Sequence, residues 1–266
     1  ITEIKLNSIM ENAGNAQLDA IIDDVNVGVV TIDAASSDGS HYMAAEFAAI
    51  STSTDASRGA AIVSNVTVDN IYTTANLTNE GEYDVSVAFA AFAEGTAYLE
   101  NVSVGDMEMA VNNSAIVSLN AAFYANIPYF GPSTNTLEYL SNEGDIVSAS
   151  VGDFVISVGE NVDDESALLF GGGINMIAAD DIIDVNIDSF TISAAAGSVV
   201  DDHGINIVAG EDFNFQGASG GLLDDVVIGD IALTTTGENA DIASWVWLDA
   251  GERFIDADIG DLTLSV

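Results

Sequence analysis

The chain has 266 residues, of which 48% are apolar, so it is long and apolar enough to bury a sizeable core. Its 43 Asp and Glu residues face only three Lys and Arg residues, which gives a formal net charge of -40. Such a surface excludes nucleic acid and anionic membranes as partners, because binding to either depends on basic residues that neutralise phosphate. Without cysteine, the chain has neither a disulfide framework nor a thiolate metal site.

The same composition indicates where the protein works. The sequence opens at Ile1 without a Met or a basic n-region, so we expect an exported product whose leader has been removed. No uninterrupted run of about 18 apolar residues occurs, so we expect no membrane insertion. A mean hydropathy of +0.32 predicts a folded chain. Because its acidic side chains repel one another unless salt or cations screen them, a marine, saline or calcium-containing setting fits the composition. Together with the removed leader, this leads us to expect an extracellular or cell-surface location.

At the start of the chain, residues 1–24 predict a strand or cap segment, in which Ile4 and Leu6 alternate with polar residues. Over 25–266 a short phrase recurs seven times: an apolar residue, any residue, a second apolar residue, then Gly or Asp and a small polar residue. The second apolar residue, which we call the marker, recurs in steps of 31 to 47 residues. The markers are Val27, Val68, Val104, Val151, Ile187, Ile228 and Ile259.

The residues around each marker predict strands throughout this region. Apolar residues alternate with polar ones, Val, Ile, Phe and Thr are frequent, and Gly, Asn, Asp and Ser punctuate the runs. The Gly-Asp pair fits either a tight hairpin turn or the corner of a β-solenoid. Because the steps are unequal, we expect a single all-β domain built as a β-solenoid of about seven irregular coils. An antiparallel β-sandwich or barrel is the alternative.

Between the third and fourth markers the chain is expected to leave this scaffold. Pro128 and Pro132 flank Tyr129 and Phe130 in the longest step, which predicts a protruding loop at about 124–145. The same half of the chain holds four Asn-x-Ser/Thr sequons, which become glycosylation sites if the source glycosylates exported proteins. Their asparagines are Asn65, Asn76, Asn101 and Asn112.

Stacked coils would place the Asp of one Gly-Asp pair beside the Asp of the next. Like charges at that separation destabilise a sheet, and a bridging Ca²⁺ would reverse the effect because it prefers oxygen ligands. Alternatively, the carboxylates accept hydrogen bonds from backbone N–H groups at the bend and otherwise face water. The candidate calcium ligands are Asp106, Asp153, Asp230 and Asp261.

Signals for catalysis are weak, and we expect no enzyme. The chain has only two histidines, His41 and His203, and neither lies in a zinc-binding or triad pattern. The paired Asp residues are so frequent that they are better explained as solvated turns. Trp245 and Trp247 lie two apart on an expected strand and so share one face. They are either core residues or, if exposed, a stacking platform for a sugar ring.

The two ends of the chain suggest assembly. An alternating strand with Leu262 and Leu264 closes the sequence, and the strand with Ile4 and Leu6 opens it. Open strand edges pair with other chains unless they are protected. Head-to-tail addition of subunits is heterologous and does not close, so it produces filaments. We therefore expect a homo-oligomer or filament joined through these strands.

From these observations we expect an extracellular structural protein that self-assembles into a filament or matrix. A first alternative is a surface adhesin or carbohydrate-binding module, which would contact a glycan through Tyr129 and Phe130 or through Trp245 and Trp247. A second alternative is a polysaccharide-degrading enzyme on a β-helix scaffold. The three basic residues argue against the enzyme, because they leave little to hold an acidic sugar. Apart from the Ca²⁺ considered above, no cofactor is expected.

Overall fold

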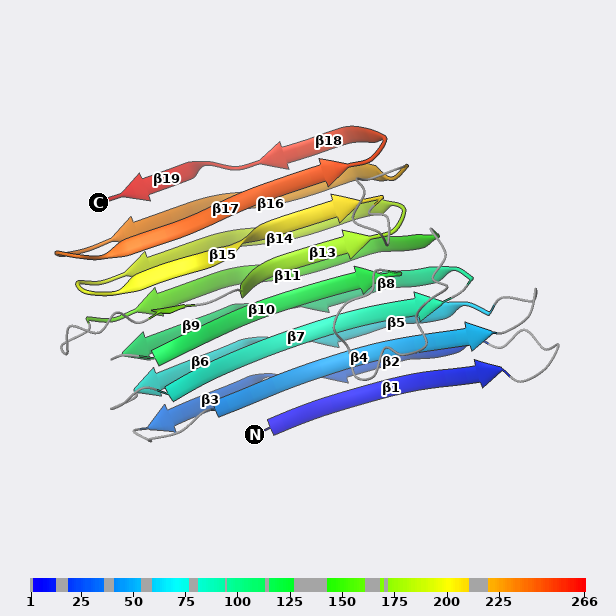
Figure 1. Cartoon of the computed structure of the whole chain (residues 1–266), viewed down its shortest axis with the longest axis horizontal. Coiled ribbons are helices and arrows are strands. Elements are labelled where there is room, and N and C mark those ends of the chain that lie inside the picture. The colour runs from blue at the N-terminus through cyan, green and yellow to red at the C-terminus, as the bar shows by residue number, and fades with distance from the viewer. Residues whose placement is uncertain are drawn as a thin grey trace.

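In the described part of the computed structural model every regular element is a β-strand, and the strands form two sheets, A and B (Figure 1). The structure describes residues 2–12, 19–35, 41–53, 59–76, 81–93, 95–112, 115–126, 143–160, 168–169, 172–210 and 220–266. The residues between these ranges include Tyr129, Phe130 and most of the expected loop, which therefore lie outside the described part.

Sheet A holds the strand that opens each repeat of the chain. It contains β1 (Thr2–Asn12), β4 (His41–Ser53), β7 (Gly81–Ala93), β10 (Ala115–Ala125), β12 (Leu168–Leu169), β13 (Gly172–Ala178), β15 (Val199–Ala209) and β17 (Asp241–Ala250).

Sheet B holds the strands that follow, and each of the seven markers lies in one of them. It contains β2 (Ala20–Val27), β3 (Val30–Ala35), β5 (Ala61–Val68), β6 (Ile71–Asn76), β8 (Ala97–Val104), β9 (Met107–Asn112), β11 (Gly144–Val158), β14 (Ile182–Ala194), β16 (Leu222–Thr235), β18 (Arg253–Ile259) and β19 (Leu262–Ser265).

The chain alternates between the two sheets, and strands pair with strands from neighbouring repeats, on both sides in the interior and on one side at the two ends of the stack. Sheet A runs β1-β4-β7-β10-β13-β15, with β17 paired to β15, and sheet B runs from β2 to β18 in the same order. Every pairing between described strands is parallel. The all-β expectation is thus confirmed, with parallel sheets. The described strands form neither the antiparallel arrangement nor a closed barrel.

The main core lies between the sheets. It consists of columns, in each of which equivalent inward-facing side chains of successive repeats pack against one another. Phe47, Phe89 and Phe123 stack in one column of sheet A, with ring centroids 5.4 and 5.0 Å apart. Phe154 and Phe190 stack at 5.2 Å in sheet B. The first strands belong to the same arrangement, because β1 pairs with β4 and β2 pairs with β5. Figure 1 shows the two termini at opposite ends of the stack.

The Gly-Asp pair occupies neither of the positions expected from the sequence. It falls between β8 and β9, which lie in the same sheet and both pair with β11 in the same direction. The chain therefore continues across the pair within one sheet, whereas a hairpin would reverse it and a corner would change sheets. In β11 the strand even runs through Gly152 and Asp153 without a break.

The repeats also share a column of residues with unusual backbone angles, which was not expected from the sequence. Three residues before each marker, one residue has a positive φ, between 48° and 58°, and the strand pairing skips it. The skipped residues of neighbouring strands occupy the same position, so the register is kept on both sides of them and neither strand gains an extra residue. Asn and Asp tolerate this backbone because their short polar side chains bond locally. The column consists of Asp24, Asn65, Asn101, Ser148, Asp184, Asp225 and Asp256.

Candidate functional site

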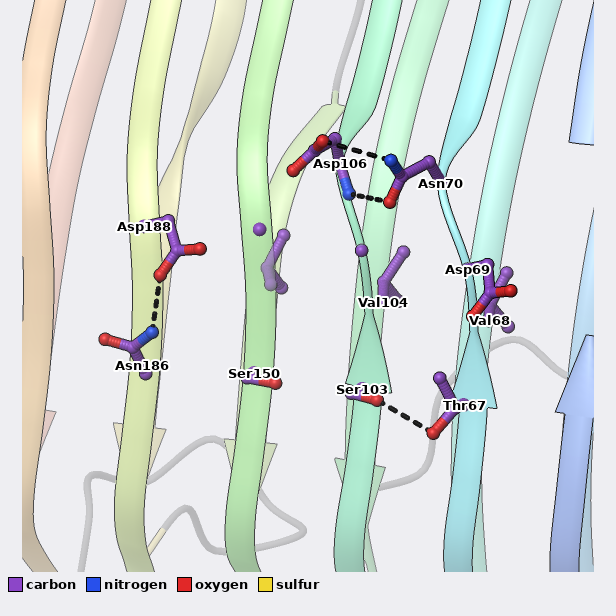
Figure 2. A pocket seen from close by; sticks show the side chains of 13 residues that line it. Thr67, Val68, Asp69, Asn70, Ser103, Val104, Asp106, Ser150, Asn186 and Asp188 are labelled. Atoms are coloured by element: carbon purple, nitrogen blue, oxygen red, sulfur yellow. Dashed lines mark hydrogen bonds between the residues drawn. The ribbon is translucent and has the colours of Figure 1, made fainter. Parts of the chain in front are cut away.

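A groove of about 280 Å³ lies where the marker phrases of neighbouring repeats stack on sheet B (Figure 2). Small and polar side chains line it, including Thr67, Ser103 and Ser150 from successive strands. The Ser103 hydroxyl donates a hydrogen bond to Thr67 Oγ1 at 3.1 Å. Further along, Asn186 Nδ2 donates to Asp188 Oδ1 at 2.6 Å. The groove is the depression that results when these phrases lie in register.

At the upper edge of the view in Figure 2, Asn70 and Asp106 hold two repeats together. The backbone N–H of Asp106 donates to Asn70 Oδ1 at 3.0 Å, and Asn70 Nδ2 donates to Asp106 Oδ2 at 3.1 Å. Asn70 Nδ2 also donates to the Tyr72 hydroxyl at 2.6 Å. The Asn70 amide and the Asp106 carboxylate, which face the groove, are thus hydrogen-bonded to each other.

The same contact explains why Gly precedes Asp in the phrase. Asp106 Oδ1 accepts a hydrogen bond from the backbone N–H of Asp153 in the next repeat, at 3.1 Å. A Cβ on Gly152 would lie only 2.6 Å from that oxygen. Asp230 accepts from Asp261 N–H at 3.0 Å, and a Cβ on Gly260 would lie 2.8 Å from Asp230 Oδ1. Asp106 and Asp230 are therefore each followed, in the next repeat, by a glycine that leaves room for the carboxylate.

The structure brings the four candidate calcium ligands together as two neighbouring pairs, Asp106 with Asp153 and Asp230 with Asp261. Ser189 lies between these pairs, and its hydroxyl donates to Asp153 Oδ1 at 2.6 Å. Within the described ranges, no group of three or more acidic or histidine side chains is arranged to hold a metal ion. Binding of Ca²⁺ at these residues remains a prediction.

Carboxylates also meet where the chain enters sheet B. Asp145 Oδ1 accepts from Asp181 N–H at 3.2 Å, and Asp181 Oδ1 accepts from Leu222 N–H at 2.8 Å. Burial raises the pKa of Asp145 to about 6, and repulsion from Asp180, Asp181 and Glu143 adds to this effect. Burial also raises the pKa of Asp180, with repulsion from neighbouring acids as the second cause. The charged forms of Asp145 and Asp180 are therefore disfavoured in the folded chain.

His203 is a core residue with one unsatisfied nitrogen. Its Nδ1 lies 3.0 Å from the carbonyl oxygen of Asp201, whereas its Nε2 is buried without a hydrogen-bond partner. Burial lowers the pKa of His203, so the neutral ring is favoured. His41 is the first residue of β4, and its side chain lies outside the described part. The structure brings no nucleophile or metal-ligand set to His203 among the described residues.

Two of the four sequon asparagines belong to the positive-φ column. Asn65 and Asn101 are exposed in strands β5 and β8, and Asn101 Nδ2 donates to Asn65 Oδ1 at 3.2 Å. Asn65 in turn donates to Asp23 at 2.9 Å. Asn112 is exposed at the end of β9, and Asn76 ends β6 with its side chain outside the described part. Glycosylation at these positions remains a prediction.

The two tryptophans are exposed, so the core interpretation is wrong for this pair. Trp247 is 59% exposed and Trp245 is 39% exposed, and both lie on the outward face of β17. The inward face of this strand carries Val246 instead, which pairs with the buried Ile205. The ring of Trp245 lies against Gly204, where a Cβ would come within 2.6 Å of it.

In the last repeat, the side chains that face inward are largely exposed. Leu262 and Leu264 pair with Ile231 and Leu233 on the inward face of sheet B, yet they are 63% and 65% exposed. In the interior repeats, the corresponding residues Phe154 and Ile156 are fully buried. Nothing in the described part of the chain covers these leucines. Other large apolar residues exposed on the same repeat are Val246, Phe254 and Ile259.

The first repeat offers a matching face. Leu6 is 40% exposed although it pairs with the buried Phe47, and Ile4 is partly buried beside it. Lys5, on the outward face, lies 3.7 Å from Glu3 and 3.8 Å from Glu46. The four predicted assembly residues, Ile4, Leu6, Leu262 and Leu264, thus lie on the two outermost repeats at opposite ends of the stack (Figure 1).

No protein-family model, curated protein or solved structure matches this chain. The described residues also contain no helix that could cross a membrane.

Proposed function

We propose that this chain is an acidic β-solenoid that serves as an extracellular or cell-surface structural subunit and joins head to tail into a filament or matrix. The observation that carries the proposal is the exposed core side of the last repeat, where Leu262 and Leu264 are more than half exposed. Large apolar side chains that lie exposed together beside an unpaired strand edge favour association with another chain.

The parallel architecture supports a second copy as the partner. The inward columns of the last repeat continue those of the interior, and the first repeat begins the same columns at the other end. A second copy can add its first repeat to the last repeat in the same strand direction. Such a contact is heterologous and does not close, so it extends to a filament.

The charge of -40 opposes this association and makes it dependent on salt. At an ionic strength of about 0.01 M the Debye length is about 30 Å, and at about 1 M it is about 3 Å. Low salt therefore keeps subunits apart, whereas saline conditions permit short-range apolar contact. This dependence fits the saline setting expected from the composition.

The proposal is tested by sedimentation and negative-stain electron microscopy of the whole chain at several concentrations and salt levels. We expect end-to-end particles whose length increases with both. Leu264→Asp should abolish them, because it places a carboxylate in the apolar junction. Thr263→Asp is the matched control, since it adds the same charge on the outward face of the same strand and should leave the particles intact.

Discrete monomers at every concentration and salt level would refute the proposal. So would equal effects of the two variants on assembly, provided that both keep the melting temperature of the parent chain. Because Leu264 is already exposed, we expect its substitution to change the melting temperature by little.

Carbohydrate binding is a second candidate function, favoured by the exposure of Trp245 and Trp247 on one face of β17. Aromatic faces stack on sugar rings, and the net charge would favour a neutral polysaccharide over an acidic one. Specific binding on a glycan array by a chain that stays monomeric would favour this function over assembly.

A further inference from the structure

We infer that the junction between two copies continues the register of the stack, so that Lys5 of one copy lies over Trp247 of its neighbour. This inference rests on the proposed head-to-tail association and specifies its geometry. The partner is a second copy of this chain, and the contact joins β1 of that copy to β17.

The strand pairings of sheet A determine which residues of the first and last strands share a column. Lys5 pairs with Glu46, and the same column continues through β7, β10 and β13 to Asn206 in β15 and then Trp247. Lys5 and Trp247 are therefore the two ends of one outward column. If β1 adds to β17 in the register that all neighbouring strands use, the next residue in the column after Trp247 is Lys5.

The inward columns give the same alignment. Leu6 begins the column that contains the stacked phenylalanines and ends at Leu248, and Ile4 begins the column that ends at Val246. A shift by one residue would place the inward apolar set of β1 on the outward face, which is costly. The apolar pattern thus restricts the junction to the proposed register and to registers shifted from it by an even number of residues.

Sheet B meets the same condition with its own apolar columns. Val30 and Leu262 are the ends of one inward column, and Ile32 and Leu264 are the ends of another. Because β3 follows β1 in the first repeat and β19 follows β17 in the last, one addition brings both sheets into register. The two exposed leucines are then covered by the valine and isoleucine of the next copy.

Continuity with the stack selects among the remaining registers, because the strand pairs along sheet A from β1 to β17 all keep Lys5 and Trp247 in one column. Lys5 is in the first repeat and Arg253 is in the last, while the third basic residue, Arg58, lies outside the described part. An ammonium group over an indole face gains a cation–π interaction, which is strongest for Trp. In the proposed register Lys5 meets this ring, and Glu3 lies two residues away opposite Trp245.

Cross-linking tests the register directly, because the parent chain has no cysteine. Asn7 and Asp249 end another outward column, so Asn7→Cys on one copy and Asp249→Cys on another should lie opposite each other. Cα atoms of opposed residues in neighbouring strands are about 5 Å apart, within the range that a disulfide bridges. Glu3→Cys with Asp249→Cys is the mismatched control, displaced by about 13 Å along the strand.

Equal amounts of a tagged and an untagged single-cysteine protein are mixed at high salt and oxidised under mild conditions. We expect the matched pair to form a disulfide-linked heterodimer at least about tenfold faster than the mismatched pair. Equal rates, or a faster mismatched pair, would overturn the register. If end-to-end particles form but the matched pair does not cross-link, the register is wrong and the proposed assembly stands. If no particles form, both proposals fall.

Substitution of Lys5 tests its role separately from the disulfide. Lys5→Arg keeps a cation that stacks on indole and should preserve assembly, whereas Lys5→Glu should raise the protein concentration needed for assembly about tenfold. Equal concentrations for the two variants would overturn the contact between Lys5 and Trp247.

Discussion

Asn101 shows how one backbone position ties neighbouring repeats together. Its φ is 51°, and its side chain donates to Asn65, which holds the same position in the preceding repeat with a φ of 52°. Glycine adopts this region without a steric cost, whereas a β-branched residue there is a strong outlier.

We therefore predict that Asn101→Val destabilises the chain by about 2 kcal/mol, while Asn101→Gly costs less than about 1 kcal/mol. Thermal unfolding at a fixed salt concentration measures both. Similar losses for Val and Gly would mean that the amide hydrogen bond to Asn65, and not the backbone conformation, determines the effect.

Asp145 is a residue whose charge opposes folding. Burial raises its pKa to about 6 from an ordinary value of 3.8, so the folded state holds its proton more tightly than the unfolded state. Its contribution to stability is therefore full below about pH 3.8 and is lost as the pH rises through about 6.

Asp145→Asn should thus stabilise the chain at pH 7.5 by about 1 kcal/mol, allowing for the partial exposure of the side chain. The gain should disappear below about pH 3.8, where the carboxyl group is already neutral. Asp225→Asn is the matched control, because it removes one exposed charge and Asn tolerates its positive φ of 52°. A gain that is the same for both variants, or independent of pH, would contradict this account.

Among the elements, the strands could be predicted from the sequence but the role of the Gly-Asp pair could not. Alternation around Val104 and Val151 identified strands, since period 2 is the property that a half-buried strand imposes. The shift of apolar phase after Gly105 is the same for a hairpin, a corner and a bend within one sheet. Only the pairing of β8 and β9 with β11 distinguishes them, and pairing partners are not encoded locally.

For the candidate sites, the sequence carried two signals of different strength. Leu262 and Leu264 were identifiable because an alternating strand follows the last marker. The positive-φ column was missed, although Asn, Asp or Ser occurs three residues before every marker, because these residues are also common in ordinary turns. The exposure of Trp247 could not be predicted, since two residues on one strand face can point inward or outward equally well.

On the scale of the whole molecule, the chain limits the repulsion among its acids by placing neutral donors between them. Asp23 accepts from the Ser64 hydroxyl at 2.8 Å, and Asp33 accepts from the Thr74 hydroxyl at 3.0 Å. Hydrogen bonds from Ser64 and Asn65 lower the pKa of Asp23, with the bond from Asn65 the larger cause. These contacts satisfy individual carboxylates, but they leave the net charge unchanged.

We therefore predict that NaCl raises the melting temperature by several degrees between about 0.01 M and 1 M, through screening. If the bend carboxylates only accept backbone N–H groups, as Asp106 and Asp230 do here, CaCl₂ and MgCl₂ at equal concentration should have similar effects, and EDTA should leave the midpoint unchanged. A larger rise with CaCl₂ that Asp153→Asn removes would instead establish the predicted calcium site.

The position of the termini at opposite ends of the stack determines how the molecule responds to force. The hydrogen bonds between repeats point along the line from one end to the other, so tension on the termini opens them one after another at the outermost strand. Since each repeat contacts mainly its neighbours, the rest of the stack stays folded meanwhile. A detached repeat of 31 to 47 residues releases up to roughly 160 Å of chain while shortening the stack by only about 4.8 Å. Such a chain would behave as a stepwise extensible tether whose length is stored in folded layers.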